Sequence, residues 1–169
     1  APFAGQLAEL LHDTHPQVKA AAAESLAQLG PQAAAPFASE VAKWLQNTYP
    51  DARAAATKLL GQLGPEGAAP FAREVAKRLH DTNPDVRAAA AKSLGQLGPE
   101  VAAPFAGQVA ELLHDTSPCV RAAAAKLLGQ LGPMVAAPFA GQVAELLHDT
   151  HTVVREAAAK SLGQLGPEV

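Results

Sequence analysis

Apolar residues recur at helical spacing along the whole chain, and residues 103–136 show the pattern clearly. Phe105, Val109 and Leu112 follow one another at intervals of four and three residues, which places them on one face of a helix. Further along, a second apolar face is formed by Val120, Ala123, Ala124, Leu127, Leu128 and Leu131. The pattern therefore predicts two amphipathic helices in this segment, and no strand.

Turn residues set the bounds of these two helices. Residues 114–116 form a polar turn between them, and Pro118 falls in the first turn of the second helix, where its missing N–H needs no partner. Pro133 follows the second helix and prevents its continuation. Because Pro133 and Pro138 cannot both lie inside an unbroken helix, we expect a single turn over 133–136 and then a helix from Pro138.

The same unit of 34 residues occurs five times, in residues 1–34, 35–68, 69–102, 103–136 and 137–169. Every unit contains an Ala-Pro-Phe-Ala tetrad and a Leu-Gly-Pro tripeptide at the same positions. Units of this length stack so that each one covers the apolar face of its neighbour. We therefore expect an all-α fold, an α-solenoid of five helical hairpins with about ten helices, forming a single domain over 1–169 in a right-handed superhelical stack.

The two terminal units lack the polar outer face that normally caps a solenoid. The pattern begins at Ala1 within the tetrad and stops at Val169, one residue before the unit closes. We therefore expect the chain to be a segment of a longer array.

Charge and composition narrow the classes of partner. The net charge is −3, and the five units carry −2, 0, +1, 0 and −2, so there is no basic stripe of the kind that binds nucleic acid. No run approaches the ~18 apolar residues of a membrane span, and no signal segment opens the chain. A single cysteine, Cys119, allows no disulfide within the chain and leaves the compartment open.

Residues 115–121, followed by an alanine-rich helix that ends in Leu-Gly-Gln-Leu-Gly, resemble a HEAT repeat in its short form. This form is also found in phycobilin-lyase-like repeat proteins, and the resemblance extends over all five units. A period of 34 residues is typical of tetratricopeptide repeats too, but their Trp-x-x-Leu-Gly-x-x-Tyr signature is absent. The resemblance implies a solenoid whose second helices line a concave face.

The resemblance also implies a structural ladder between neighbouring repeats, built from an aspartate in the turn and an arginine six residues later. The corresponding pairs are Asp13 with Lys19, Asp81 with Arg87, Asp115 with Arg121, and Asp149 with Arg155. The second repeat has Asn47 before Arg53, which keeps a hydrogen-bond acceptor and removes the charge.

Two sets of side chains are candidate binding surfaces. Trp, Tyr and Arg often anchor protein interfaces, and repeats two and three depart from the pattern with such residues. The first, partner-binding set comprises Lys43, Trp44, Tyr49, Arg73, Lys77 and Arg78, with Trp44 expected to pack on one side and present the other. The second set is a row on the second helices, Lys58, Lys92, Lys126 and Lys160, which either meets an acidic partner or simply suits the helix dipole.

Candidate catalytic and metal-binding residues are few. The histidines His12, His80, His114 and His148 share one turn position, but stacked repeats separate them by about 10 Å, whereas zinc ligands lie about 2 Å from a shared ion. Cys119 has no evident base beside it. We therefore expect no metal, no cofactor and no enzymatic activity.

The function that fits these features is a non-catalytic scaffold or adaptor, which binds another protein or a larger protein assembly along its helical faces. Two alternatives remain open at this point. One is an enzyme or chaperone that handles a bilin or a metal, as the family resemblance allows. The other is a consensus-designed repeat protein without a native function, which the near-identity of repeats four and five would suit.

Overall fold

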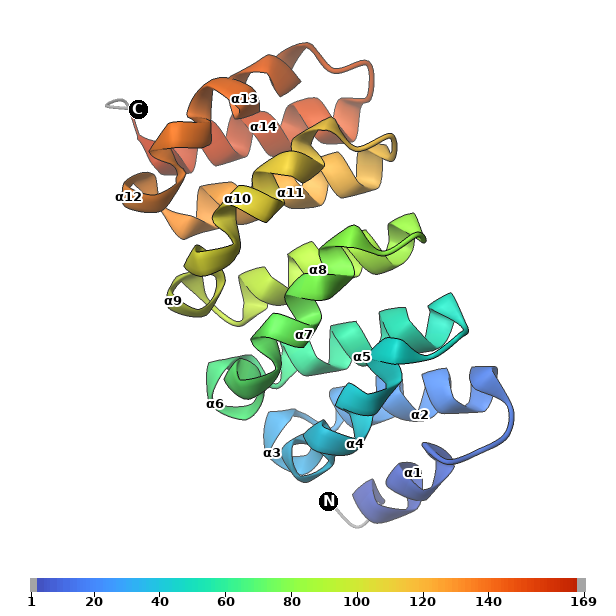
Figure 1. Ribbon diagram of the computed structural model, residues 1–169. Helices are drawn as coiled ribbons and strands as arrows, with labels where there is room; N and C mark the ends of the chain where they lie inside the picture. The colour runs from blue at the N-terminus through green and yellow to red at the C-terminus, as the bar shows by residue number, and fades with distance from the viewer. Residues whose placement is uncertain (1–2, 167–169) are drawn as a thin grey trace.

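The computed structural model describes residues 3–166, and all the regular secondary structure in that range is helical. Each repeat forms a hairpin of a short first helix and a longer second helix, and the hairpins stack in chain order (Figure 1). The first helices are α1 (Ala4–Leu10), α4 (Ala38–Lys43), α7 (Ala72–Lys77), α10 (Ala106–Glu111) and α13 (Ala140–Glu145). The second helices are α2 (Pro16–Gln28), α5 (Pro50–Gln62), α8 (Pro84–Gln96), α11 (Pro118–Leu131) and α14 (Thr152–Leu165). The predicted α-solenoid of helical hairpins is confirmed.

Local chemistry sets the ends of the second helices. Proline occupies the first turn of α2, α5, α8 and α11, and Asn83 additionally caps α8 by accepting a hydrogen bond from the backbone N–H of Asp85 at 2.8 Å. After the helix, Gly98 and Gly132 adopt φ values of 91° and 76°, a left-handed conformation that glycine tolerates best. Within residues 3–166, no helix is both long and apolar enough to cross a membrane.

The first helices are shorter than the apolar pattern predicts, because 3₁₀ turns flank four of them. One set of turns holds the Ala-Pro-Phe segments: η1 (Ala35–Phe37), η3 (Ala69–Phe71), η5 (Ala103–Phe105) and η7 (Ala137–Phe139). The other set ends the helices: η2 (Trp44–Gln46), η4 (Arg78–His80), η6 (Leu112–His114) and η8 (Leu146–His148). Pro138 therefore lies in η7, and the α-helix begins at Ala140, two residues later than expected.

Short helical turns connect one repeat to the next, at α3 (Pro31–Ala34), α6 (Gly64–Ala68), α9 (Pro99–Ala102) and α12 (Pro133–Ala136). The turn expected over 133–136 is therefore present as α12. Each connector contains one fully buried alanine, such as Ala102 and Ala136, and α9 and α12 each pack against the second helices of their own and the next repeat.

The apolar core runs through the whole stack, between the layer of first helices and the layer of second helices. The valines of the first helices, Val41, Val75, Val109 and Val143, are fully buried at equivalent places in four repeats. Each second helix contributes leucines such as Leu60, Leu94 and Leu128, which are also fully buried. Since every hairpin uses its neighbours to cover these residues, the core is continuous from one hairpin to the next.

Neighbouring second helices pack against each other in chain order, and a glycine allows the closest approaches. A Cβ atom added at Gly129 of α11 would lie 2.8 Å from Cα of Ser161 in α14. At the same place Ser161 donates its hydroxyl to the carbonyl oxygen of Ala125 across the junction, at 2.6 Å. The junction between α5 and α8 repeats this geometry with Gly61 and Ser93. Small residues at these positions therefore bring the second helices into one tightly packed layer.

Candidate protein-interaction surfaces

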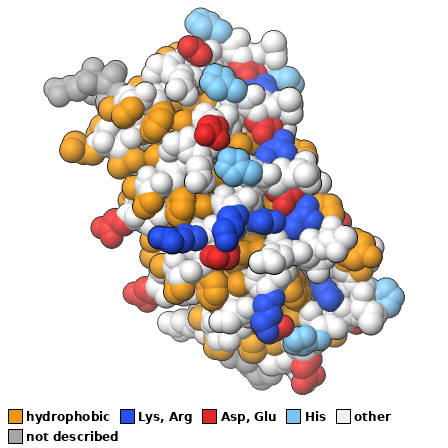
Figure 2. Space-filling view, in the orientation of Figure 1, with side chains coloured by type: hydrophobic (Ala, Val, Ile, Leu, Met, Phe, Trp, Pro, Cys, Tyr) orange, Lys and Arg blue, Asp and Glu red, His pale blue; other side chains and the backbone are white. Residues whose placement is uncertain are grey.

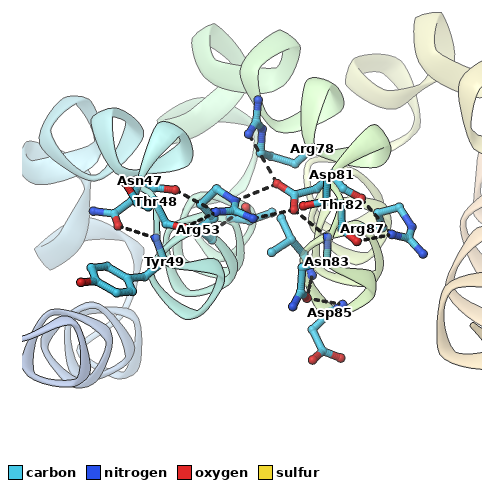
Figure 3. A network of polar contacts seen from close by, with 12 residues as sticks. Asn47, Thr48, Tyr49, Arg53, Arg78, Asp81, Thr82, Asn83, Asp85 and Arg87 are labelled. Atoms are coloured by element: carbon cyan, nitrogen blue, oxygen red, sulfur yellow. Dashed lines mark hydrogen bonds and ion pairs between the residues drawn. The ribbon is translucent and has the colours of Figure 1, made fainter.

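A ladder of arginine–aspartate pairs joins repeats two to five along the turns of the hairpins. Nη2 of Arg53 donates to Oδ1 of Asp81 at 2.8 Å, and Nε donates to Oδ2 at the same distance (Figure 3). The pairs Arg87–Asp115 and Arg121–Asp149 have the same two-bond geometry, with Nε–Oδ2 distances of 2.7 Å. A planar guanidinium group suits a carboxylate in this way, so each pair fixes the register of two hairpins.

The pairing differs from the one implied by the family resemblance. Within one repeat, Arg87 donates Nη1 to the backbone carbonyl oxygen of Asp81 at 2.8 Å, while its carboxylate partner is Asp115 of the next repeat. The same holds for Arg121, whose contact with Asp115 is through that residue's carbonyl. Within a repeat, the arginine thus contacts the backbone carbonyl oxygen of the expected aspartate and not its carboxylate. Its remaining N–H groups extend to the aspartate carboxylate in the turn of the next repeat. Arg155 likewise donates to the carbonyl of Asp149, at 2.7 Å.

The ladder lowers the pKa of its carboxyl groups. Burial alone would raise the pKa of Asp81, but hydrogen bonds from Arg53 and from the backbone N–H of Asn83 outweigh it and hold the pKa below its usual range. Asp115 shows the same balance, with its pKa lowered by Arg87. The hydrogen bond from Arg121 lowers the pKa of Asp149 to about 2. These carboxylates are therefore ionised at neutral pH.

The first junction uses different chemistry. Lys19 replaces the arginine and Asn47 replaces the aspartate, and the Lys19 ammonium instead lies 5.7 Å from the centre of the Trp44 ring, within the range of a cation–π interaction. Asp13 accepts hydrogen bonds from the backbone N–H and the ring of His15, and the backbone hydrogen bond is the largest cause of its lowered pKa.

The expectation that Trp44 presents one side to a partner is wrong. Only 6% of its surface is exposed, because η2 turns the ring into the core beneath Lys19. Arg78 occupies the same place in repeat three and contacts the carboxylate of Asp81 at 3.5 Å, so it extends the ladder and its side chain is only 23% exposed. In Figure 3, Tyr49 and Arg78 lie on opposite sides of the Arg53–Asp81 pair, so they do not share one patch.

The remaining basic residues of this set lie on the first helices. Figure 2 shows Lys and Arg side chains gathered across the middle of the face that the first helices form, at the level of α7. Two cations of the first helices already have partners, since Lys43 of α4 pairs with Glu40 at 2.8 Å and Lys77 of α7 pairs with Glu74 at 3.4 Å. Arg73 is exposed on α7. This face is thus rich in cations that neighbouring carboxylates partly neutralise.

The lysine row lies on the opposite helix of each hairpin and borders a groove. Lys58, Lys92, Lys126 and Lys160 are all exposed, one on each of α5, α8, α11 and α14. A groove of about 550 Å³ crosses α2, α5 and α8 and reaches the start of α11. It is lined by Gln17, Ala20, Ala21, Glu24, Asp51, Ala54, Ala55, Lys58, Asp85, Ala88, Ala89, Lys92 and Cys119. The structure thus assigns two of the four lysines to the groove, while Lys126 and Lys160 continue the row beyond it.

The charges of this groove are arranged in rows. Asp51 and Asp85 form an acidic wall at the start of their helices, alanines form the floor, and Lys58 and Lys92 form the opposite wall. Among residues 3–166, no carboxylate lies within ion-pair distance of Lys58, Lys92 or Lys126, whereas Lys160 pairs with Glu156 at 2.5 Å. The acidic wall was missed in the sequence, although its seven-residue separation from the lysines places both on one helix face.

Histidine and cysteine side chains form no metal site in the part of the chain that is described. His80, His114 and His148 are exposed, each at the end of its own first helix. No group of three or more His, Cys, Asp or Glu side chains within residues 3–166 is placed to hold a metal ion. Cys119 is exposed in the first turn of α11 and lines the groove.

Comparison with known proteins agrees with this architecture. Residues 4–78, 38–110 and 106–169 each match the family model for HEAT repeats, so the matches together extend over almost the whole chain. No curated protein matches the sequence.

Similar solved structures show the same fold at low sequence identity. An engineered protein has a TM-score of 0.78 and 22% identity, covering 96% of this chain and 78% of the other. The complex of CpcE and CpcF of phycocyanin lyase from Nostoc sp. PCC7120 includes a chain with a TM-score of 0.71 and 21% identity, covering 95% and 98%. A designed armadillo repeat protein in complex with the peptide (KR)4 has a TM-score of 0.77 and 15% identity, covering 95% and 80%.

Proposed function

The chain belongs to the HEAT repeat family, and on this basis we propose that it is a non-catalytic scaffold or adaptor that binds a partner protein in the groove of its second helices. The observation that carries the proposal is the row of exposed lysines beside an alanine floor, with no carboxylate partner for Lys58 or Lys92 among the described residues. A cation that is not neutralised within its own chain is available to a partner.

The fold supports a binding role of this kind. A stack of hairpins presents one surface that repeats with every unit, which suits an elongated partner such as another protein or a larger assembly. Two of the similar structures are complexes, one with the peptide (KR)4 and one between two lyase subunits. Neither partner is carried over to this chain, because the groove here has a lysine wall of its own.

The groove is favoured over the face of the first helices for two reasons. Trp44, the expected anchor of that face, is buried, and Lys43 and Lys77 pair with carboxylates on their own helices. A ligand carboxylate that binds Lys43 or Lys77 must replace the existing ion pair, which reduces the net binding free energy. Lys58 and Lys92 lose no ion pair on binding. The proposal therefore replaces the first candidate surface with the second.

A peptide library displayed on phage tests the proposal directly. Peptides are selected on the immobilised chain and then measured against two triple variants. The first, Lys58→Gln/Lys92→Gln/Lys126→Gln, changes the lysine row and is called the groove variant; the second, Lys43→Gln/Arg73→Gln/Lys77→Gln, changes the first helices. Both variants remove three positive charges, so a non-specific charge effect is equal in the two. We expect the groove variant to weaken the selected peptides by about tenfold and the control by less than about twofold.

Two results would overturn the proposal. One is the absence of any enriched peptide that binds above the background of the bare support. The other is a loss of binding in the first-helix variant that equals or exceeds the loss in the groove variant. Circular dichroism of both variants checks that neither has lost its helical fold.

A further inference from the structure

The lysine row repeats at the spacing of the second helices, and this spacing fixes the distance between the anionic groups that an elongated ligand must carry. Each second helix packs on the next, and helices in such contact lie 8–10 Å apart. The lysines occupy the same place in four successive helices, so their positive charges recur at about this interval across the stack. A ligand that meets every lysine must therefore present an anionic group every 8–10 Å on one side.

Few backbone conformations meet this condition. A polyproline II helix has three residues per turn and rises about 3.1 Å per residue, so every third side chain points the same way at intervals of about 9.3 Å. A β-strand places same-face side chains only about 6.6 Å apart. An α-helix needs seven residues, about 10.5 Å, and its diameter of 10–12 Å fills the whole distance between the acidic and lysine walls.

The walls and floor of the groove fit the slimmer ligand. Along α5, the seven residues from Asp51 to Lys58 separate the two walls by about 10.5 Å. Alanines between them project only a methyl group, so a ligand backbone can approach the helices closely. A polyproline II backbone has no internal hydrogen bonds, and the exposed amides of Gln62 and Gln96, one turn beyond the lysines, can hydrogen-bond its peptide groups.

We propose, building on the groove function above, that the lysine row, inside the groove and beyond it, binds a peptide in the polyproline II conformation that carries an acidic residue at every third position. One carboxylate per turn meets Lys58, Lys92 and Lys126 in succession, and a fourth meets Lys160, which shares its charge with Glu156. In repeat one the row is interrupted by Glu24, so the acidic run of the peptide ends at repeat two.

The acidic wall does not prevent this binding. Asp51 and Asp85 lie about 10.5 Å from the lysines along their helices, which is close to one Debye length at 0.1 M salt. Their repulsion of a carboxylate at the lysine wall is therefore largely screened, while the direct contact with a lysine about 3 Å away is not. Asp51 and Asp85 instead repel any acidic residue on the side of the peptide that faces away from the lysines.

The spacing is tested with labelled synthetic peptides and fluorescence anisotropy at about 0.1 M salt. The matched peptide repeats Glu-Pro-Pro four times, and the mismatched peptide repeats Glu-Pro-Pro-Pro four times. Both carry four glutamates and favour the same conformation, but the second rotates each carboxylate by about 120° from the previous one. We expect the matched peptide to bind about fivefold to tenfold more tightly, and Lys92→Gln to weaken it about twofold to fivefold.

A cross-link locates the bound peptide. Cys119 is the only cysteine of the chain and lines the groove, so a photo-reactive maleimide attached there should cross-link the matched peptide. The control moves the label to the exposed Ser39 on α4, in the variant Ser39→Cys/Cys119→Ser, which should cross-link little. Labelling that is stronger from position 39 would place the peptide on the first helices and overturn the proposal.

The outcomes separate this inference from the proposed function. Equal affinity for the two peptides, each lost in the groove variant, would overturn the three-residue spacing and leave the groove function standing. If neither peptide binds while library-selected peptides do so through the lysines, the acidic polyproline II ligand is wrong and the groove function again stands. A library that yields no binder removes the proposed function itself.

Discussion

Each arginine of the ladder uses one guanidinium group to bind two sites, a backbone carbonyl in its own repeat and a carboxylate in the next. Arg87 donates Nη1 to the carbonyl of Asp81 in its own turn and Nε and Nη2 to the carboxylate of Asp115 in the next. Lysine has no such fork, and where Lys19 takes this place it faces the Trp44 ring instead. The chemistry of one residue therefore decides whether a junction is held by an ion pair.

Removing one ladder carboxylate should destabilise the protein. Asp115→Asn keeps the acceptor for the backbone N–H of Ser117 but removes the charge that Arg87 contacts, leaving a partly buried guanidinium without its ion-pair partner. We expect the free energy of unfolding to fall by about 2 kcal/mol, measured by urea denaturation. Asp51→Asn, at an exposed carboxylate outside the ladder, serves as the control and should change it by less than about 0.5 kcal/mol. Similar effects of the two substitutions would refute a structural role for the pair.

Residue-level roles were only partly predictable. The aspartates and arginines of the ladder stand out in the sequence through their fixed spacing of six residues. Their actual partners do not, because Arg53 meets Asp81 across 28 residues and the offset depends on how one hairpin sits on the next. Trp44 was misplaced for a similar reason, since its position at the edge of the apolar stripe does not reveal that Lys19 and the core cover it.

At the scale of the helices, glycine at one repeat position controls how closely two second helices approach. A Cβ atom added at Gly61 or Gly129 would lie 2.7 or 2.8 Å from the Cα atom of Ser93 or Ser161 in the next repeat, and one added at Gly95 would meet the side-chain amide of Gln130. Gly163 holds the same place in α14, and nothing described lies within 4 Å of its Cβ position. Backbone contact therefore requires glycine at the Gly61 and Gly129 junctions, whereas a methyl group at Gly95 would meet mainly the movable end of Gln130 and one at Gly163 would meet nothing described.

This contrast gives a matched pair of substitutions. Gly129→Ala places a methyl group against the backbone of Ser161, so we expect a loss of about 1–3 kcal/mol despite the better helix propensity of alanine. Gly163→Ala meets no neighbour and should stabilise the protein by up to about 1 kcal/mol through propensity alone. Urea denaturation of the full chain measures both changes in the free energy of unfolding. A stabilising Gly129→Ala would show that the junction is looser than the structure has it.

At the scale of the whole molecule, the ladder couples stability to pH. The folded pKa of Asp149 is about 2, below its ordinary value of 3.8, and the pKa values of Asp81 and Asp115 are lowered as well. A carboxylate with a lowered folded pKa stabilises the protein above its unfolded pKa, and this contribution is lost as the pH falls through the folded value. For Asp149 the loss extends from about pH 4 to about pH 2.

We therefore expect the chain to unfold at a lower urea concentration at about pH 2.5 than at about pH 6. The variant Asp149→Asn has no titrating carboxyl group at position 149. Its free energy of unfolding should therefore be lower than that of the parent chain at about pH 6, and it should fall less than that of the parent chain between about pH 6 and about pH 2.5. If the variant and the parent chain lost equal stability on acidification, the contribution would have to come from other carboxylates.

The repeated sequence by itself determined the hairpin, the number of repeats and the solenoid, because helical periodicity, prolines and glycines act within a few residues of one another. It also indicated the lysine row, since equal positions in equal units must lie in line. Only the tertiary structure decided which carboxylate each arginine meets, that Trp44 is buried, and that acidic and lysine walls border one groove. Those features depend on the register between neighbouring hairpins. This register arises from packing across the junction, so the sequence pattern of a single repeat does not predict it.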